Sequence, residues 1–250
     1  MAARLFLGWQ APETRRWFVV GFLDWDGCKY RFGYTQGFRA AEKMGFGPLA
    51  AFPEVDEIYE AESLFPFFEN RLLKKSRPDF GAHMDELALS GAEFDEKILI
   101  LARSGGRRVT DEYFIFAPPV RKDGRLEYVF FSNGLRHLPQ IPEDELARVK
   151  ETPVYTCKDF QNEFDPKALL LRSPSGYLLG WCPRYLCDDV LRILEETGEP
   201  NAVRVVVDGI NPPPAPIQFR IRCRLTAPWP KAHEPMSGHQ YQPLVKLVEA

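Results

Sequence analysis

Two short apolar runs, Val154-Tyr-Thr-Cys157 and Ala168-Leu-Leu-Leu171, flank the turn Phe160-Gln-Asn-Glu-Phe-Asp-Pro-Lys-Ala-Leu169. A third run, Tyr177-Leu-Leu-Gly180, leads into Gly180-Trp-Cys-Pro-Arg184. The apolar runs have the composition of strands, while Asn, Asp and Pro favour turns between strands. Donors, acceptors, an aromatic ring and a nearby cation together predict a small polar binding site. The pattern alone does not indicate catalysis.

Three separated motifs in this half share one order and spacing. They are Asn133-Gly-Leu-Arg-His137, Asn162-Glu-Phe-Asp-Pro-Lys-Ala168 and Gly180-Trp-Cys-Pro-Arg184. Together they resemble a HIRAN domain over roughly residues 126–228. The resemblance implies a small β-barrel or curled sheet with one or two helices. In this pattern the first motif is a strand, residues 187–196 form a helix, and residues 218–225 form a closing strand.

The resemblance also implies a ligand. In eukaryotic HIRAN domains the matching residues hold the 3′ end of single-stranded DNA. Asp165 would then accept a hydrogen bond from the terminal 3′-hydroxyl, Phe164 would stack on a base, and Asn162 would hold backbone or base edges. Arg184 would meet a phosphate of the strand. The other implied DNA-binding residues are Arg136, His137 and Trp181.

Each of these residues also has a structural interpretation. Residues 162–165 fit an Asx-type turn, whose side chains bind their own backbone. Trp181 is better explained as an anchor buried at a strand-to-helix corner. His137 fits a strand surface equally well, and Leu138 follows it where the family has an aromatic residue. Phe164 stands where the family has tyrosine, so that hydroxyl is absent.

The first half of the chain carries a second set of motifs. These are Tyr30-Arg-Phe-Gly-Tyr34, Phe65-Pro-Phe-Phe-Glu-Asn-Arg-Leu72 and Ile98-Leu-Ile-Leu-Ala-Arg-Ser-Gly-Gly106. In this order they resemble the N-terminal subdomain of HipA-type kinases. The resemblance implies an α/β module that binds or regulates a partner, for example a HipA-type kinase encoded as a separate chain in a toxin–antitoxin system.

The expected fold class is α+β, with two domains. A HipA-N-like domain spans residues 1–117, a Pro-rich linker 118–125, a HIRAN-like domain 126–228, and an extended C-terminal tail 229–250. Apolar alternation and an Asp-Gly turn predict paired strands over 17–34. Helices are expected over 38–44, 64–73, 82–89 and 95–103, followed by a strand over 111–116. Ser63 is the expected N-cap of the second helix.

Composition narrows the class of protein. The chain of 250 residues is 45% hydrophobic and 27% charged, which is typical of a globular protein. No apolar run approaches the ~18–20 residues of a membrane span, so no membrane partner is expected. Five cysteines, an odd number without a C-x-x-C motif, favour a reducing, cytoplasmic setting. A net charge of −3 predicts that any contact with nucleic acid is local and modest.

Catalytic and metal-binding motifs are missing from the sequence. It contains no G-x-S-x-G, no H-E-x-x-H and no G-x-x-x-x-G-K-[ST] loop, and its four histidines have no metal-like spacing with cysteines. We therefore expect a non-enzymatic binding module with no cofactor and no metal. The first hypothesis is recognition of single-stranded DNA or DNA ends. The second is protein interaction or regulation without DNA binding.

A basic stripe offers one further possibility. Arg220, Arg222 and Arg224 alternate with apolar residues, so the three cations are expected on one face of a strand. A solvated sheet face explains this pattern better than a surface that follows a phosphate backbone.

Overall fold

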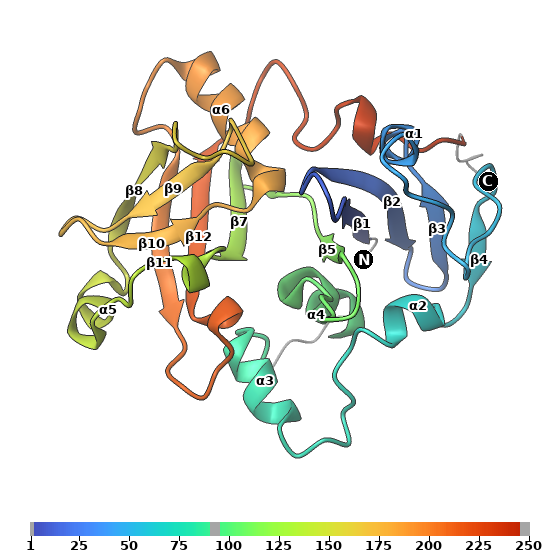
Figure 1. Cartoon of the computed structure of the whole chain (residues 1–250), viewed down its shortest axis with the longest axis horizontal. Helices are drawn as coiled ribbons and strands as arrows, with labels where there is room; N and C mark the ends of the chain where they lie inside the picture. Colours follow the sequence, from blue (N-terminus) through green and yellow to red (C-terminus); the bar gives the residue numbers. More distant parts are fainter. Residues whose placement is uncertain (1–2, 91–95, 246–250) are drawn as a thin grey trace. The chain divides into compact units, whose positions relative to one another are not determined.

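The computed structural model describes residues 3–90 and 96–245 of the chain (Figure 1). The chain divides into two compact units. Unit 1 contains the residues up to Pro118 and those from Ser237 onward, and unit 2 contains Pro119–Met236. Each unit has its own antiparallel sheet with a few short helices, so the predicted α+β class is confirmed. No helix within the described residues is long and apolar enough to cross a membrane.

Unit 1 is built on a five-stranded antiparallel sheet in the order β4-β3-β2-β1-β5. The strands expected over residues 17–34 are β2 and β3, which pair in register from Gly21 with Tyr34 to Trp25 with Tyr30. The central strand β2 is buried over six consecutive residues, in keeping with its continuous apolar sequence. The strands are β1 Ala3–Gln10, β2 Trp17–Trp25, β3 Tyr30–Tyr34, β4 Tyr59–Ala61 and β5 Tyr113–Phe116.

An aromatic cluster fills the core of unit 1. The rings of Phe32 and Phe52 are stacked with centroids 4.0 Å apart, and the ring of Phe68 lies 5.8 Å from that of Phe32. All three side chains are at most 1% exposed. Such rings bury large apolar areas, so this cluster makes a large contribution to the stability of unit 1. The helices of unit 1 are α1 Gly37–Glu42, α2 Pro66–Glu69, α3 Phe80–Glu86 and α4 Glu96–Ser104.

The helix expected over residues 64–73 is much shorter in the structure. Helix α2 is a single turn, and its N-cap is Phe65 rather than Ser63. Pro66 occupies the first helical position, where its fixed φ and missing N–H favour a helix start. The last expected helix begins at Glu96 in the structure, and residue 95 lies outside the described residues.

Unit 2 contains a seven-stranded antiparallel sheet in the order β10-β9-β8-β11-β12-β7-β6. The expected closed barrel is wrong, because β10 and β6 are the two edges of this sheet. One isolated bridge joins Asn133, just after β7, to Trp181 at the end of β10. The strands are β6 Val120–Lys122, β7 Arg125–Phe131, β8 Pro153–Lys158, β9 Leu169–Arg172, β10 Leu178–Trp181, β11 Arg204–Ile210 and β12 Ile221–Pro228.

Helix α6, Arg184–Thr197, is the longest helix of the described chain and covers the helix expected over 187–196. It buries an apolar stripe and ends at Gly198, whose left-handed conformation (φ 66°) is a common way to end a helix. The helix α5, Glu143–Val149, was not expected from the sequence. The short 3-10 segments are η1 Leu135–His137 and η2 Ile217–Phe219 in unit 2, and η3 His239–Tyr241 in unit 1.

Two expected boundaries differ from the structure. The segment expected as a linker, residues 118–125, contains β6, which pairs with β7 at the edge of the sheet. The segment expected as an extended C-terminal tail, 229–250, is divided between the two units up to the last described residue. Its final part is held by unit 1, since the Gln36 N–H donates to the Gln242 carbonyl and the Leu244 N–H to the Tyr34 carbonyl, both at 2.8 Å.

Candidate functional site

The turn between β8 and β9 is shaped by the side chain of Asn162. Its Oδ1 accepts hydrogen bonds from the backbone N–H groups of Phe164 at 3.1 Å and Asp165 at 2.9 Å. Its Nδ2 donates to Oδ2 of Asp159 at 3.2 Å. This is the Asx-type turn of the structural interpretation. Asn162 therefore fixes the turn and presents Phe164 and Asp165 in a defined geometry.

Asp165 and Arg184 form an ion pair at the centre of the predicted site. The Nε of Arg184 lies 3.0 Å from Oδ2 of Asp165, and its Nη2 donates to the Phe164 carbonyl at 3.1 Å. The Asp165 side chain is only 14% exposed, and its Oδ1 accepts the Lys167 N–H at 3.0 Å. Arg184 begins α6, where the helix dipole disfavours a cation, so the carboxylate of Asp165 offsets that cost. The resemblance implied separate roles for these two residues, and the structure joins them in one ion pair.

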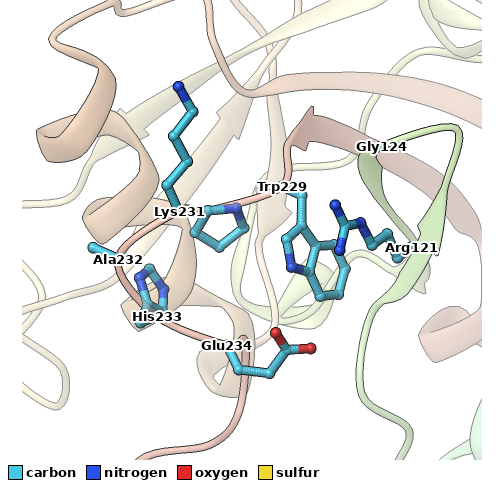
Figure 2. Close-up of a pocket in the computed structure, with 8 residues that line it drawn as sticks. Arg121, Gly124, Trp229, Lys231, Ala232, His233 and Glu234 are labelled. Atoms are coloured by element: carbon cyan, nitrogen blue, oxygen red, sulfur yellow. The ribbon is translucent and has the colours of Figure 1, made fainter.

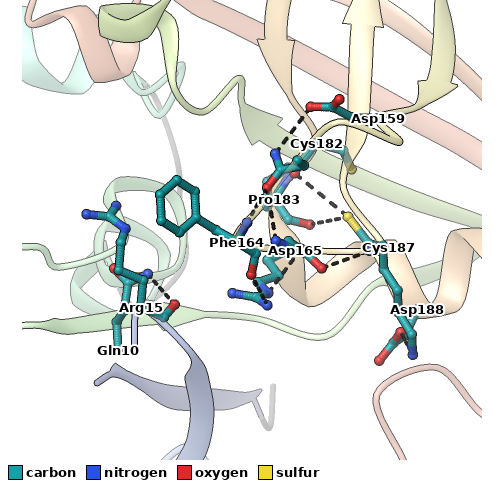
Figure 3. A network of polar contacts seen from close by, with 12 residues as sticks. Gln10, Arg15, Asp159, Phe164, Asp165, Cys182, Pro183, Cys187 and Asp188 are labelled. Carbon is teal, nitrogen blue, oxygen red and sulfur yellow. Dashed lines mark hydrogen bonds and ion pairs between the residues drawn. The ribbon is translucent and has the colours of Figure 1, made fainter. Parts of the chain in front are cut away.

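Trp181 is fixed from two sides. Its Nε1 donates to Oδ2 of Asp159 at 2.9 Å. That hydrogen bond, followed by those from Asn162 and the Gln161 N–H, lowers the pKa of Asp159. Gly134 lies against the indole, because a Cβ at that position would stand 2.6 Å from the ring. Asp159 is a site residue that the sequence analysis missed, although it directly precedes the turn. Figure 3 shows Asp159, Phe164 and Asp165 in this polar network.

Two phenylalanine side chains extend from the same turn into solvent. Phe164 is 59% exposed and Phe160 is 85% exposed. The Nζ of Lys158 lies 5.2 Å from the centroid of the Phe160 ring, a cation–π arrangement. Phe160 was quoted in the sequence pattern but given no role. Phe160 lies two residues before Asn162, and its exposure on the surface of the turn could not be predicted from the sequence alone.

The family pattern predicted that Arg136 and His137 lie in a strand. In the structure they lie in the 3-10 segment η1 instead. Gly134, at φ 76°, adopts a left-handed conformation and turns the chain out of β7 into η1. Both side chains are exposed, and Nε of Arg136 donates to Nε2 of His137 at 3.0 Å. The neighbouring Asn133–Trp181 bridge ties this segment to β10 and so to the predicted site.

The basic stripe is largely neutralised within the chain. Asp208 pairs with Arg222, at 2.9 Å, and with Arg224, while Arg220 pairs with Glu143. Burial alone would raise the pKa of Asp208, but the hydrogen bonds from the two arginines lower it. These contacts favour a solvated sheet face over a phosphate-binding stripe.

A separate pocket of about 620 Å³ lies at the other edge of unit 2 (Figure 2). The guanidinium of Arg121 stands 5.5 Å from the centroid of a Trp229 ring. Nε2 of His233, another lining residue, lies 3.4 Å from a carboxylate oxygen of Asp189, and burial raises the pKa of that carboxyl. The lining residues include none of the predicted site residues; they are Arg121, Gly124, Trp229, Pro230, Lys231, Ala232, His233 and Glu234.

The cysteines show no sign of a reactive or metal-binding centre in the part of the chain that the structure describes. Cys182 and Cys187 are buried at the start of α6, and the hydrogen bond with Cys187, followed by burial, raises the pKa of Cys182. Within residues 3–90 and 96–245, no group of three or more His, Cys, Asp or Glu could hold a metal ion.

Comparison with known proteins gave limited results. No protein-family model matches the chain, and no curated protein matches it. Similar solved structures include the HIRAN domain of human HLTF, at 18% identity and a TM-score of 0.30, over 41% of this chain and 74% of that one. A protein from Lactobacillus plantarum is similar at 14% identity and a TM-score of 0.29, over 41% of this chain and 96% of that one.

Likenesses with such low TM-scores carry no argument about function. Nothing in these comparisons supports the resemblance of the first half to HipA-type kinases, which stays a prediction. The roles of the seven site residues likewise stay predictions.

Proposed function

We propose that unit 2 is a non-enzymatic module that binds single-stranded DNA and recognises its free 3′-hydroxyl end. The observation that carries the proposal is the exposed ring of Phe164 beside the Asp165–Arg184 pair. An exposed aromatic ring can stack on any base, at about 1–3 kcal/mol per base. The motif resemblance to HIRAN domains supports the same conclusion.

The ion pair suits a strand end better than a strand interior. A carboxylate next to a chain of phosphates is repelled by them, but it can accept a hydrogen bond from a terminal hydroxyl. Arg184 would meanwhile attract the nearest phosphate, and Trp181 and Asn162 would hold the turn in place. The exposed Arg136 and His137 would contact the nucleotides that precede the terminal one. With the acidic and basic residues of the chain almost balanced, the affinity is expected to be modest and sensitive to salt.

The test is binding of short single strands that end in a 3′-hydroxyl or a 3′-phosphate. We expect the hydroxyl end to bind about tenfold more tightly, since a hydrogen bond to a charged group contributes roughly 1.5–3 kcal/mol. Asp165→Ala should abolish this preference, whereas Arg184→Gln should weaken both ligands alike. Fluorescence anisotropy at ~50 mM salt would measure the affinity of the parent protein and of each variant for both ends, because phosphate contacts are strongest at low ionic strength.

Asp188→Asn is the matched control. Asp188 pairs with Lys167 at 2.6 Å on the surface of unit 2 and is not one of the predicted site residues. Loss of its charge should therefore leave the end preference unchanged. Equal affinity for the two ends, or no binding to either, would reject DNA-end recognition. The alternative is then the protein-interaction or regulatory role, for example with a HipA-type kinase. Either role suits a reducing, cytoplasmic setting, in which the five free cysteines would persist.

A further inference from the structure

The outer face of β8, β9 and β10 is a continuous surface that leads to the predicted site. Cross-strand pairing places Cys157 opposite Leu170 and Leu170 opposite Trp181. The next row along β8 and β9 pairs Tyr155 with Arg172. Residues two apart in a strand point to the same face, about 6.6 Å from each other. Tyr155 and Arg172 therefore lie one row beyond the row that ends at Trp181.

This face is aromatic and exposed. Tyr155, on this face, is 61% exposed. Tyr177 is 42% exposed, but it precedes Leu178, the partner of Arg172, in the β9–β10 turn and so does not belong to the rows of this face. With Phe160 and Phe164 they are the strongly exposed aromatic side chains of the described residues, and all four belong to β8, β10 or the adjoining turns. Several solvent-exposed rings in one part of unit 2 are suited to stacking with the bases of a ligand.

Two of these rings have a neighbouring cation, and neither cation is paired with a carboxylate within the described residues. Lys158 stands over Phe160, and Arg172 is the cross-strand neighbour of Tyr155. Nε of Arg172 donates to the Gly176 carbonyl at 3.3 Å, and neither cation has an ion pair within the described residues. By contrast, Arg184 and Lys167 near the same turn are paired with carboxylates. Phosphate groups would complement the two cations that lack such partners.

We infer that this outer face is the path along which a single-stranded nucleic acid leads to the end site. Tyr155 stacks on a base and Arg172 neutralises a phosphate, one or more nucleotides before the terminal one. Alternating rings and cations are the arrangement by which proteins follow single strands without reading their sequence. The inference rests on the proposed function, because it extends the same binding site.

Strand length is the first test. Oligo(dT) of about three and about ten nucleotides, both with a free 3′-hydroxyl, would be titrated at low salt. The longer strand should bind about tenfold more tightly, because one more stacked base and phosphate contribute that much. Tyr155→Ala and Arg172→Gln should each remove most of this gain and leave the binding of the short strand and the end preference intact. Tyr177→Ala is the control, since Tyr177 lies outside the two rows and should change neither affinity.

The exposed thiol of Cys157 offers a second readout that needs no change in the binding surface. In a Cys28→Ser background, the exposed cysteine of the described chain is Cys157, and the other three are buried. Its alkylation by iodoacetamide should slow severalfold with the long strand bound and stay unchanged with the short strand at equal occupancy.

The outcomes separate the inference from the proposed function. If no strand of either length binds, both are overturned. If the short and long strands bind equally, with a preserved preference for the hydroxyl end and unchanged alkylation of Cys157, the path is wrong and the end site stands. Slower alkylation with both lengths would place even the short strand on this face and overturn the assigned order.

Discussion

Phe68→Ala is expected to lower the free energy of unfolding of unit 1 by roughly 3–5 kcal/mol. Phe68 is 1% exposed, and its ring contacts Phe67 with centroids 5.0 Å apart as well as the stacked pair Phe32 and Phe52. Alanine would leave a cavity among rings that cannot all collapse into it, which adds to the lost burial. Urea denaturation followed by hydrogen exchange and mass spectrometry would measure the loss separately for each unit.

Phe65→Ala on the same turn is the control. Phe65 is only half-buried, although its ring lies 5.1 Å from that of Phe52, so a clearly smaller loss is expected. Unit 2 should keep its exchange rates in both variants. If Phe68→Ala melted with the parent protein, the buried position of this ring in the core would be wrong.

The second large effect is expected at the glycine that precedes Trp181. Gly180→Ala should destabilise unit 2 by roughly 2–4 kcal/mol, from backbone strain and a steric clash together. Gly180 has φ 96°, and a Cβ there would stand 2.0 Å from Oγ of Ser132 and 2.5 Å from the Asn133 carbonyl oxygen. Relief of the clash must push β10 away from Asn133. The two backbone hydrogen bonds between Asn133 and Trp181, both 2.9 Å, should therefore be lost.

Gly124→Ala separates strain from collision. Gly124 also has a positive φ, 75°, but no atom lies within 4 Å of a Cβ at that position. Its substitution should cost only about 1–2 kcal/mol. Hydrogen exchange should accelerate at the Asn133 and Trp181 amides in Gly180→Ala alone. Similar stabilities for the two variants would contradict the close approach of β10 to residues 132 and 133.

The strands around the predicted site could be read from the sequence because their apolar runs are short and bounded by turn formers. β8, β9 and β10 lie within a residue or two of the runs at 154–157, 168–171 and 177–180. The sequence analysis missed five strands, β1, β4, β6, β7 and β11. Leu5, Leu7 and Trp9 alternate with other residues and would have predicted β1. The helix over 64–73 was overextended, since periodicity in a window cannot show that Pro66 starts a single turn.

The predicted site was harder to foresee than the strands. Asx turns are local, and the geometry at Asn162 follows from its neighbours in the sequence. The pairing of Asp165 with Arg184, by contrast, depends on how α6 meets the β8–β9 turn, which no local pattern specifies. The same holds for Asp159, whose bond to Trp181 joins residues 22 positions apart. The small β-barrel that the resemblance implied is not closed, because the chain makes one bridge to β10 at Asn133 and then turns away at Gly134.

Because the chain returns to unit 1 at Ser237, the ribosome completes unit 1 only after it has made all of unit 2. Gln242, Leu244 and Tyr241, which dock on Gln36, Tyr34 and Phe6, are made only after all of unit 2. At about 5–20 residues per second, translation from residue 119 to residue 244 takes roughly 6–25 seconds. Throughout that interval the nascent sheet of unit 1 lacks the C-terminal segment that docks on it. The inserted unit can finish folding first, although its synthesis starts second.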